Sequence, residues 1–396
     1  NRIRSFLNLK IFMQSRNNNM NCRVCGSNYF PNTLLSFTDM PSSAQGFPMV
    51  ETLKDDTGSD LDVFQCLSCG LIQLDAQPVS YFKEVIRAAA FSEEMCDFRT
   101  SQFKIWVNEY GLLNKNILEV GCGKGEYLSI LNKSGVFAHG VEFSEQAIAV
   151  CRELGYRVTK GYFGDNDFTL PVSQYDGFIC LNFMEHWPDP NQALTHLHSS
   201  LKDDAVGLLE VPNFNMILEK NLFSEFIADH LMYFTEDTLT FILQSNGFEV
   251  INCSPIWHGY ILSAIVKKRT KIDLTSFENY RLKIKNDLNL FIDQFNYKRV
   301  AIWGAGHQSL AVISLAEIGG KIKYVVDSAS FKQGKYTPAT HLPIVAASFL
   351  KSDPVEAVII MAASYSDEVA KILRENYSNN LKIAILRDYG LENYEG

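Results

Sequence analysis

Apolar and polar residues follow one another in a way that predicts alternating strands and helices in the middle of the chain. The apolar run 117–120 leads into three closely spaced glycines, and an apolar pattern at helical spacing begins at Tyr127. A second apolar run, 138–141, ends at an acid, and the runs 174–181 and 208–213 read as the fourth and fifth strands. This alternation predicts a doubly wound, mostly parallel sheet.

A second block of the same kind follows residues 273–296, whose apolar positions recur at the spacing of an amphipathic helix. Strands are predicted from Arg299, from Ile322 and from Val358, and a last one covers 382–386. The chain is therefore expected to be an α/β protein with a second, smaller Rossmann-like unit at its C-terminal end.

The first eighty residues carry a different signal, two Cys-x-x-Cys-Gly motifs formed by Cys22 and Cys25 and by Cys66 and Cys69. Each turn places two thiolates on one side of a tight loop, and four thiolates are the ligand set of a structural zinc site. The forty-residue spacer is longer than in common zinc ribbons, and a redox role of either pair is the alternative. Zinc explains how so short a segment folds, so we expect a structural rather than a catalytic metal.

The length and net charge of the chain bear on the number of domains and on the kinds of partner. The 396 residues predict two or three domains, and we place them at 20–80 (zinc-binding), 81–270 and 271–396. Residues 1–19 are expected to be a disordered or added extension before Met20. A net charge of −9 disfavours nucleic acid as a partner, and no apolar run is long enough for a membrane span. We expect a cytoplasmic monomer or homodimer.

The glycine-rich segment 119–125 carries the most informative chemistry. Its glycines let a ligand approach the backbone at a strand–helix switch, and Glu142, at the end of the next strand, is placed for ribose hydroxyls. A Gly-x-Gly alone would also fit NAD. The Gly-x-Gly-x-Gly spacing, with Glu119 two residues before the first glycine, resembles that of class I S-adenosylmethionine (SAM) methyltransferases.

This resemblance implies SAM as the cofactor and a class I Rossmann-like methyltransferase domain. It assigns Glu142 to the ribose and Asp165 to the adenine, and we add Asn182 at the end of the fourth strand. The cofactor-binding candidates are Glu119, Gly121, Gly123, Gly125, Glu142, Asp165 and Asn182.

Catalytic candidates follow the fourth strand, whose carboxyl end opens onto the ligand crevice of a doubly wound sheet. His186, next to Glu185, is a candidate general base near neutral pH. Many class I methyltransferases carry Glu-His here, so the pair indicates the class rather than one chemistry. His230 and Tyr233 precede a helix predicted to begin after Thr235, and are either substrate contacts or structural hydrogen-bonding groups.

The second unit opens with its own glycine loop, Trp303-Gly304-Ala305-Gly306, and its next strand ends in Asp327. The pattern is close to a dinucleotide site, but Ser309 stands at the third glycine position. This pattern fits an NAD-binding site, a vestigial site, or a unit that arose by gene duplication.

Taken together, the three parts resemble the sugar C-methyltransferases of deoxysugar biosynthesis. The resemblance covers residues 20 to about 390. It rests on the cysteine pairs with the stretch 70–74, on the loop 119–125, on the stretch 229–234, and on 325–327 with 332–338 and 341–344. The last of these is the most specific, since a generic methyltransferase does not need it.

The resemblance implies methylation of a carbon on a nucleotide-linked keto-deoxysugar through a base-generated enolate. His186 would be the base and Glu185 would orient it, while Tyr233 or His230 would hold the sugar or its oxyanion. The nucleotide would lie between the middle and last domains. Candidate contacts for its diphosphate are Gly304, Gly306, Lys332 and Lys335.

Some positions depart from the family pattern. Residues 258–260 read His-Gly-Tyr instead of Gly-Gly-Ser, the loop 303–309 differs, and the tyrosine-rich stretch before the SAM domain is reduced to Tyr81-Phe82. We expect these positions to set substrate choice. The alternatives are an O- or N-methyltransferase acting on a sugar or other small molecule, an inactive zinc-stabilised nucleotide-binding protein, and an NAD-linked oxidoreductase.

Overall fold

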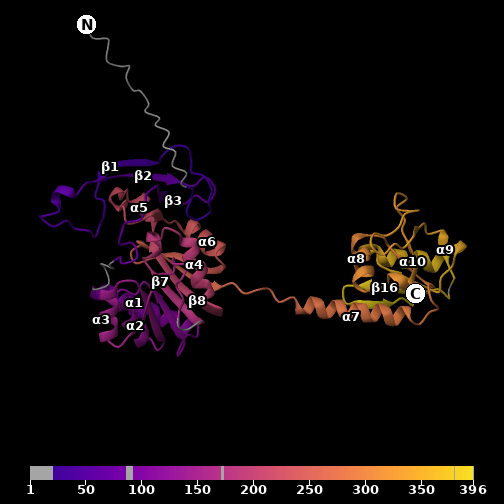
Figure 1. The fold of residues 1–396 in the computed structure, drawn as a ribbon. Coiled ribbons are helices and arrows are strands. Elements are labelled where there is room, and N and C mark those ends of the chain that lie inside the picture. Colours follow the sequence, from indigo (N-terminus) through magenta and orange to yellow (C-terminus); the bar gives the residue numbers. More distant parts are fainter. Residues whose placement is uncertain (1–20, 86–91, 171–173, 379, 396) are drawn as a thin grey trace, which may run out of the picture. The chain divides into compact units, whose positions relative to one another are not determined.

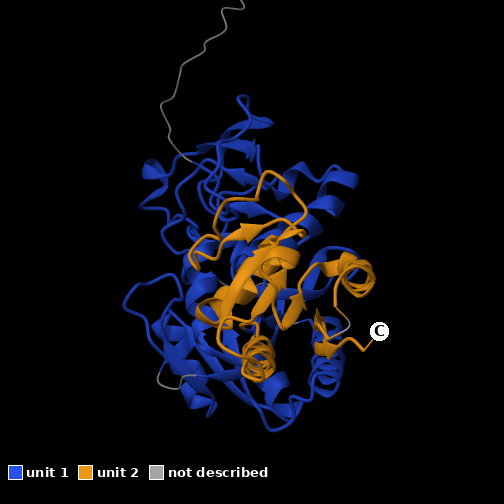
Figure 2. Cartoon of the chain, turned by 90° about the vertical axis from the view of Figure 1, so that its right-hand side faces the viewer, with its two compact units in different colours: residues 1–270 blue, residues 271–396 orange. Residues whose placement is uncertain are grey.

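A computed structural model describes residues 21–85, 92–170, 174–378 and 380–395 (Figure 1). The chain divides into two compact units, Asn1–Thr270 and Lys271–Gly396 (Figure 2). The extension expected at 1–19 lies outside the described residues. No helix in the described ranges has the length and apolar character needed to cross a membrane.

The first unit is built on a seven-stranded sheet with the order β10-β11-β8-β7-β4-β5-β6. All neighbours are parallel except β11, which runs antiparallel to both β8 and β10. The strands are β4 (Asn116–Val120), β5 (Phe137–Glu142), β6 (Arg157–Lys160), β7 (Tyr175–Leu181), β8 (Leu201–Pro212), β10 (Phe248–Ile256) and β11 (Ile261–Lys268). Strand order reverses between β4 and β7, which is where a doubly wound sheet binds its ligand. The predicted class I methyltransferase fold is confirmed.

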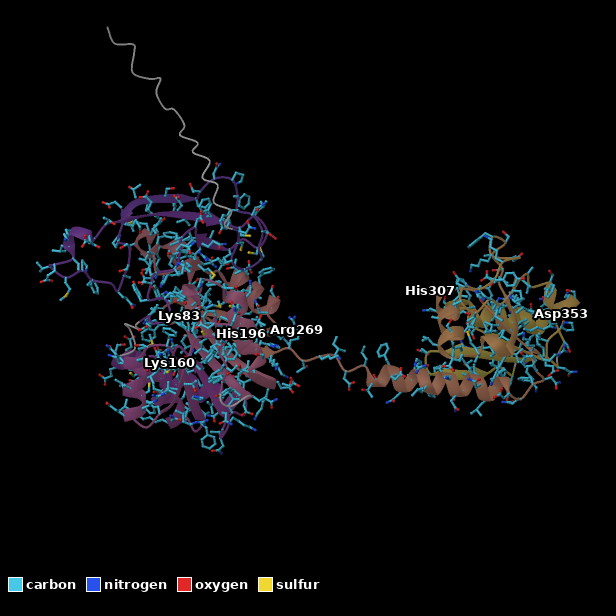
Figure 3. The ribbon with its side chains drawn as sticks, in the orientation of Figure 1. Lys83, Lys160, His196, Arg269, His307 and Asp353 are labelled. Carbon is cyan, nitrogen blue, oxygen red and sulfur yellow. The ribbon has the colours of Figure 1, made fainter. Side chains whose placement is uncertain are left out.

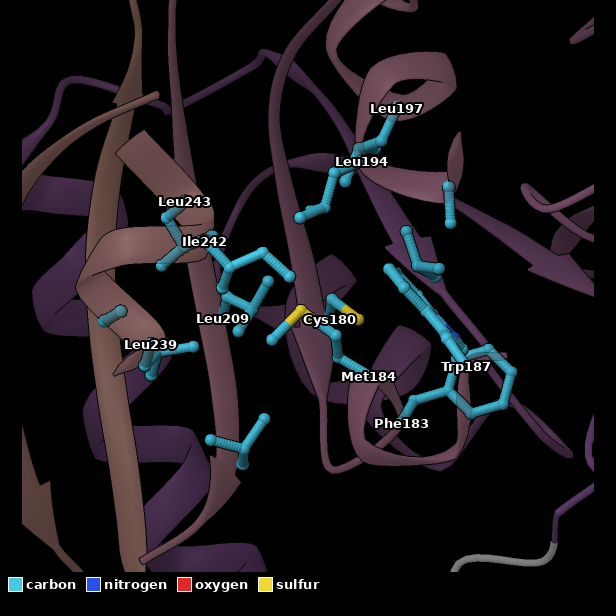
Figure 4. Close-up of a cluster of buried hydrophobic side chains, with 14 of the residues drawn as sticks. Cys180, Phe183, Met184, Trp187, Leu194, Leu197, Leu209, Leu239, Ile242 and Leu243 are labelled. Carbon is cyan, nitrogen blue, oxygen red and sulfur yellow. The ribbon is translucent and has the colours of Figure 1, made fainter. Parts of the chain in front are cut away.

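Helices cover both faces of this sheet and bury an apolar cluster on each. They are α1 (Glu93–Glu109), α2 (Glu126–Lys133), α3 (Glu145–Glu153), α4 (Pro190–Ser199) and α6 (Glu236–Ser245). Helix α5 (Phe214–Glu219) instead packs in a separate apolar cluster with residues from 61–74. The 3₁₀ turns of this unit are η1 (Leu53–Asp55), η3 (Met184–His186) and η4 (Phe223–Glu225). One cluster joins Leu194 of α4 and Ile242 of α6 to Met184 and Trp187 of the segment after β7 (Figure 4). That segment is thereby anchored in the core.

The cysteine module, residues 21–80, does not form a core of its own. Its strands β1 (Leu35–Met40), β2 (Ser59–Gln65) and β3 (Ile72–Leu74) are completed by β9 (Met232–Tyr233), which comes from the methyltransferase segment. Val63 and Leu74 pack against Phe214 and Phe226 in one apolar cluster. A segment this short cannot bury enough surface alone, so it shares the core of the same compact unit.

The second unit has a six-stranded sheet with the order β14-β13-β12-β15-β16-β17, in which only β17 is antiparallel. Its elements are α7 (Thr275–Ile292), β12 (Val300–Trp303), α8 (His307–Leu315), η5 (Gly319–Lys321), β13 (Ile322–Val326), β14 (Ile344–Val345), α9 (Phe349–Ser352), β15 (Ala357–Ile360), η6 (Ala363–Tyr365), α10 (Ser366–Asn376), β16 (Lys382–Arg387) and β17 (Gly390–Asn393). The order reverses between β12 and β15, beside the second glycine loop. The predicted Rossmann-like unit is present.

Candidate active site

The first glycine loop lies at the switch point of the seven-stranded sheet. Gly121, Gly123 and Gly125 all have positive φ angles, 69°, 56° and 86°. A Cβ atom on Gly121 would come within 2.8 Å of the Phe183 ring, so only glycine fits there. The Glu142 carboxylate accepts the backbone N–H groups of Gly123 (2.8 Å) and Ser144 (2.9 Å). This acid is therefore fixed at the mouth of the loop.

A pocket at this loop is lined by both backbone and aromatic groups. Its lining residues are Lys83, Val120, Gly121, Val141, Glu142, Phe143, Gly161, Tyr162, Phe163, Phe183 and Trp187. The free space is about 10 Å³, room for about one water molecule. The ammonium of Lys83 lies 4.8 Å from the centre of the Phe143 ring, and that of Lys160 lies 5.8 Å from it. Figure 3 labels both lysines in the first unit.

Lys83 lines this pocket but is not among the candidates that the sequence predicts. Its Nζ atom lies 2.7 Å from Oδ1 of Asp165, the candidate adenine contact. The two residues are far apart in the chain, and nothing in the local pattern around Lys83 points to the pocket. The ion pair therefore joins the lining of the pocket to one of the predicted cofactor residues.

Asn182 and Glu119, two further cofactor candidates, lie outside the lining of this pocket but next in sequence to lining residues. Asn182 has a left-handed φ of 50°, and its Oδ1 atom is buried with no hydrogen-bond partner among the described residues. An N–H donor of a ligand would satisfy it, because a buried carbonyl oxygen without a partner is costly. Glu119 is fully buried in β4 behind the loop. These features suit a ligand with an amino group and a ribose, as SAM has.

His186 is held in one tautomer. Its Nδ1 atom lies 2.7 Å from the carbonyl oxygen of Asp229. A carbonyl only accepts hydrogen bonds, so Nδ1 carries the proton and Nε2 carries the lone pair. The side chain is 4% exposed, and burial lowers the pKa of His186 to about 4 despite the opposing carbonyl. At neutral pH the imidazole is thus an uncharged proton acceptor at Nε2.

Glu185 and His230 complete a buried group around His186. Glu185 Oε1 is 3.9 Å from His186 Nε2, beyond hydrogen-bond distance, so Asp229 rather than Glu185 orients the ring. The rings of His186 and His230 are 4.8 Å apart in an edge-to-face arrangement. Burial, and secondarily His186, lower the pKa of His230 to about 3. His230 is more exposed than His186, so it lies nearer to the surface of the site.

Tyr233 does not present its hydroxyl to a substrate. The hydroxyl accepts the N–H of Ile227 at 3.1 Å and lies 3.4 Å from the carbonyl of Glu225. The side chain is buried, which raises its pKa. Of the two readings of Tyr233, the structure favours the structural one, because the hydroxyl satisfies buried backbone groups of the turn before His230. The helix that follows begins at Glu236 with Thr235 as its N-cap, as expected.

The Asp229 carboxylate is held by Ala44 of the cysteine module and by Tyr81, the residue that directly follows the module. Tyr81 donates its hydroxyl to Asp229 Oδ1 at 2.6 Å, and the N–H of Ala44 donates to Oδ2 at 2.8 Å. Asp229 is 3% exposed, so both of its carboxylate oxygens are fixed. The segment that carries His230 is thereby tied down from the N-terminal side.

The four predicted cysteine ligands converge. Cys22 and Cys69 have their sulfurs 3.6 Å apart, Cys25 and Cys66 3.4 Å, and all four sulfurs lie within 4.8 Å of one another. Four sulfurs at the usual 2.3 Å from one zinc ion are about 3.8 Å apart, so the quartet is close to that geometry. The N–H groups of Ser68 and Cys69 point at Cys66 Sγ, as expected for a thiolate ligand.

In the second unit, the glycine loop borders a cavity of about 460 Å³. Gly304, Gly306 and Lys332 line it, whereas Lys335 is exposed and outside its lining. Asp327 accepts the N–H groups of Ala305 and Ala329, both at 2.8 Å, and pairs with Lys332 at 2.9 Å. A Cβ on Gly304 would lie 2.5 Å from the carbonyl oxygen of Met361. The cavity therefore repeats the loop-and-acid arrangement of the first unit.

Comparison with known families agrees with this geometry. Residues 87–252 match the model of a methyltransferase domain, and residues 266–385 match the model of the C-methyltransferase C-terminal domain. The protein is thus a SAM-dependent methyltransferase.

Proteins of similar sequence indicate which kind of methyltransferase this chain resembles. C-methyltransferase NovU of Streptomyces niveus is 21% identical over 392 residues, which covers 90% of this chain and 93% of that protein. The ubiquinone biosynthesis O-methyltransferase of Pseudomonas paraeruginosa is 29% identical, but covers only 35% of this chain and 64% of its own. A solved SAM-dependent methyltransferase from Clostridium acetobutylicum has 13% identity over 44% of this chain and 92% of its own, with a TM-score of 0.38. The two matched models, in this order, and the similarity to NovU along most of the chain support the expected resemblance to C-methyltransferases.

Proposed function

We propose that the protein transfers the methyl group of SAM to a carbon atom of a nucleotide-linked keto-deoxysugar. The observation that carries this proposal is the neutral His186, whose free lone pair lies in a buried site at the carboxyl end of β7. A carbon acceptor needs such a base, because a C–H next to a carbonyl must lose its proton before it can attack. The two matched family models support the transfer of a methyl group to carbon.

The reaction begins with proton transfer from the sugar carbon to His186 Nε2. The electrons of that C–H bond form an enolate, whose negative charge rests on the former carbonyl oxygen. His230, neutral and adjacent, carries one N–H that can stabilise this oxygen. Tyr233 is not proposed for this role, because its hydroxyl accepts the backbone N–H of Ile227.

SAM, when bound, supplies an electrophilic methyl group on a positively charged sulfur. The enolate carbon would form the new C–C bond as the methyl–sulfur bond breaks, and the sulfur would leave neutral with the electron pair. Glu142 would bind the ribose, Asp165 the adenine and Asn182 the amino group, while Gly121, Gly123 and Gly125 let the backbone approach. Phe183 and Trp187 line the same pocket and would exclude water from it.

The cysteine quartet would hold zinc in a structural role. All four thiolates come from the protein, so no coordination position stays open for substrate. The cavity at Gly304, Gly306 and Lys332 is the proposed site of the nucleotide, because its loop amides and ammonium suit a diphosphate. Lys335, outside that lining, would contact only a part of the substrate that extends beyond the cavity.

Oxygen or nitrogen is the rival acceptor, favoured by the similarity of the SAM domain to O-methyltransferases. The test incubates the protein with SAM and a panel of nucleotide-linked keto-deoxysugars, and reads the products by mass spectrometry and carbon NMR. The proposal expects one new C–CH₃ group next to a carbonyl. An O–CH₃ or N–CH₃ signal would establish the rival, and no methyl on any keto-sugar would refute the proposed acceptor class.

A further inference from the structure

The cysteine module contacts two segments of the proposed active site, the one that carries His186 and the one that carries His230. On the His186 side, Arg23 lies between two of the cysteine ligands and donates from Nη1 to the carbonyl of Pro188 at 3.2 Å. Its Nη2 donates to the carbonyl of Ala76, within the module, at 2.5 Å. The Arg23 guanidinium therefore bridges the module to the chain two residues after His186.

A second contact reinforces the same place. Asn191, at the start of α4, donates from Nδ2 to the carbonyls of Arg23 (3.1 Å) and Val24 (2.8 Å). The N–H of Arg23 donates to Oε1 of Gln73, which is fully buried in β3. Arg23 is thus held by its backbone and its side chain together, in a geometry set by the first cysteine turn.

On the His230 side, the contact is a strand pairing. The second cysteine turn leads directly into β3, where Ile72 and Gln73 pair with Tyr233 and Met232 of β9. The N–H of Leu74 also donates to the carbonyl of Leu231 at 3.0 Å. The residues immediately after His230 therefore belong to the sheet of the cysteine module.

Two hydrogen bonds then join the histidine segments to each other. Leu231 donates its N–H to the carbonyl of Glu185 at 2.9 Å, and His186 donates Nδ1–H to the carbonyl of Asp229 at 2.7 Å. The first cysteine turn contacts one segment and the strand after the second cysteine turn contacts the other. Bringing the four sulfurs together fixes the distance between these two contacts.

We propose that the cysteine module positions the base, with Arg23 as its positioning residue. Joining the two cysteine turns sets the position of the His186 segment relative to the His230 segment. That relative position brings His186 within hydrogen-bond distance of Asp229, and this hydrogen bond fixes the His186 tautomer. The inference rests on the proposed function for the role of His186, but its structural part does not depend on the substrate.

Hydrogen–deuterium exchange measured by mass spectrometry tests the structural part without substrate. The full-length protein is compared with and without a zinc chelator, and with Arg23→Met, which keeps all four cysteines. We expect both changes to speed exchange in peptides covering 184–191 and 229–234 by about tenfold, since hydrogen bonds that fix them are lost. The glycine-loop peptide 117–128 should be unchanged. Equal exchange everywhere, or a uniform increase that includes 117–128, would overturn the proposal.

Kinetics test the functional part. Arg23→Met should lower kcat about tenfold while the Kd for SAM and the zinc content per chain stay within about twofold. Arg23→Lys, which can still donate to a carbonyl, should restore most of the loss. Arg152→Met, an exposed arginine on α3, is the matched control and should behave as the native protein. A lowered zinc content in Arg23→Met, or no rescue by lysine, would contradict a positioning role. If the native protein methylates no keto-sugar, the proposed function fails, and the exchange result still decides the structural part.

Discussion

His186 and Asp229 are joined by a hydrogen bond of 2.7 Å between an imidazole nitrogen and a backbone carbonyl, across 43 residues of sequence. The bond fixes which nitrogen of His186 carries the proton. It also makes the proposed base depend on the segment that carries His230, since Asp229 directly precedes that residue. The carboxylate of Asp229 is in turn held by Tyr81 and Ala44.

The first prediction concerns pH and stability. Burial lowers the pKa of His186 to about 4 and that of His230 to about 3, below the value near 6.5 of an unfolded chain. Between these values the unfolded chain binds more protons, so the free energy of unfolding should fall as pH drops from about 6.5 toward 4. The slope is up to about 1.4 kcal/mol per pH unit for each histidine.

Urea unfolding at pH 7.0 and at pH 5.0 measures this effect. The native protein should lose more stability over this interval than His186→Gln, which has one buried histidine fewer. His258, an exposed histidine, supplies the control variant His258→Gln, which should keep the native slope. Equal slopes in all three proteins would show that His186 is protonated normally in the folded state.

The second prediction separates a catalytic from a structural side chain. His186→Ala should lower kcat by about 10²- to 10⁴-fold, the usual contribution of a general base, with little change in the Kd for SAM. Tyr233→Phe should leave kcat within a few-fold but lower the free energy of unfolding by about 1–2 kcal/mol, because it leaves the buried N–H of Ile227 without its acceptor. Steady-state kinetics and urea unfolding of both variants measure these effects. A large loss of kcat in Tyr233→Phe, with a loss of stability alone in His186→Ala, would exchange the two roles.

The third prediction concerns the glycine loop. Gly121→Ala puts a methyl group 2.8 Å from the Phe183 ring, beside the pocket, and should weaken SAM binding by at least about tenfold. Gly155→Ala is the matched control, since Gly155 has a similar φ of 78° but open space around it. Isothermal titration calorimetry with SAM should give a near-native Kd for the control. A Gly121→Ala protein that binds SAM normally would place the cofactor elsewhere.

The fourth prediction concerns the metal. Elemental analysis should find about one zinc ion per chain, and Cys66→Ser should lower the thermal midpoint and the zinc content together. Cys253→Ser, which alters a cysteine far from the quartet in sequence, is the control and should keep the metal. Native stability in Cys66→Ser would show that the module folds without metal, contrary to its proposed role.

Local sequence patterns identified the parts of the site that local structure builds. The spacing of Gly121, Gly123 and Gly125, and the acid Glu142 one strand later, follow from a strand–turn–helix geometry that sequence encodes directly. The four cysteines were likewise recognisable, because each pair is a single turn.

Contacts between distant segments could not be read in this way. Lys83 reaches Asp165 and Arg23 reaches Pro188 across 82 and 165 residues, and no periodicity records such distances. The pairing of β3 with β9 is similarly hidden, since β9 has only two residues. For the same reason the sequence left the role of Tyr233 open, and only its contact with Ile227 favours a structural one.

Proton exchange at the sugar carbon tests directly whether His186 acts as the base that forms the enolate. A keto-deoxysugar nucleotide that the native protein methylates is incubated in deuterated water with S-adenosylhomocysteine in place of SAM, so that no methyl can be transferred. We expect the native protein to introduce deuterium next to the carbonyl, and His186→Ala to do so at least about a hundredfold more slowly. Exchange that proceeds equally well in His186→Ala, or methyl transfer by the native protein with no exchange at that carbon, would contradict it.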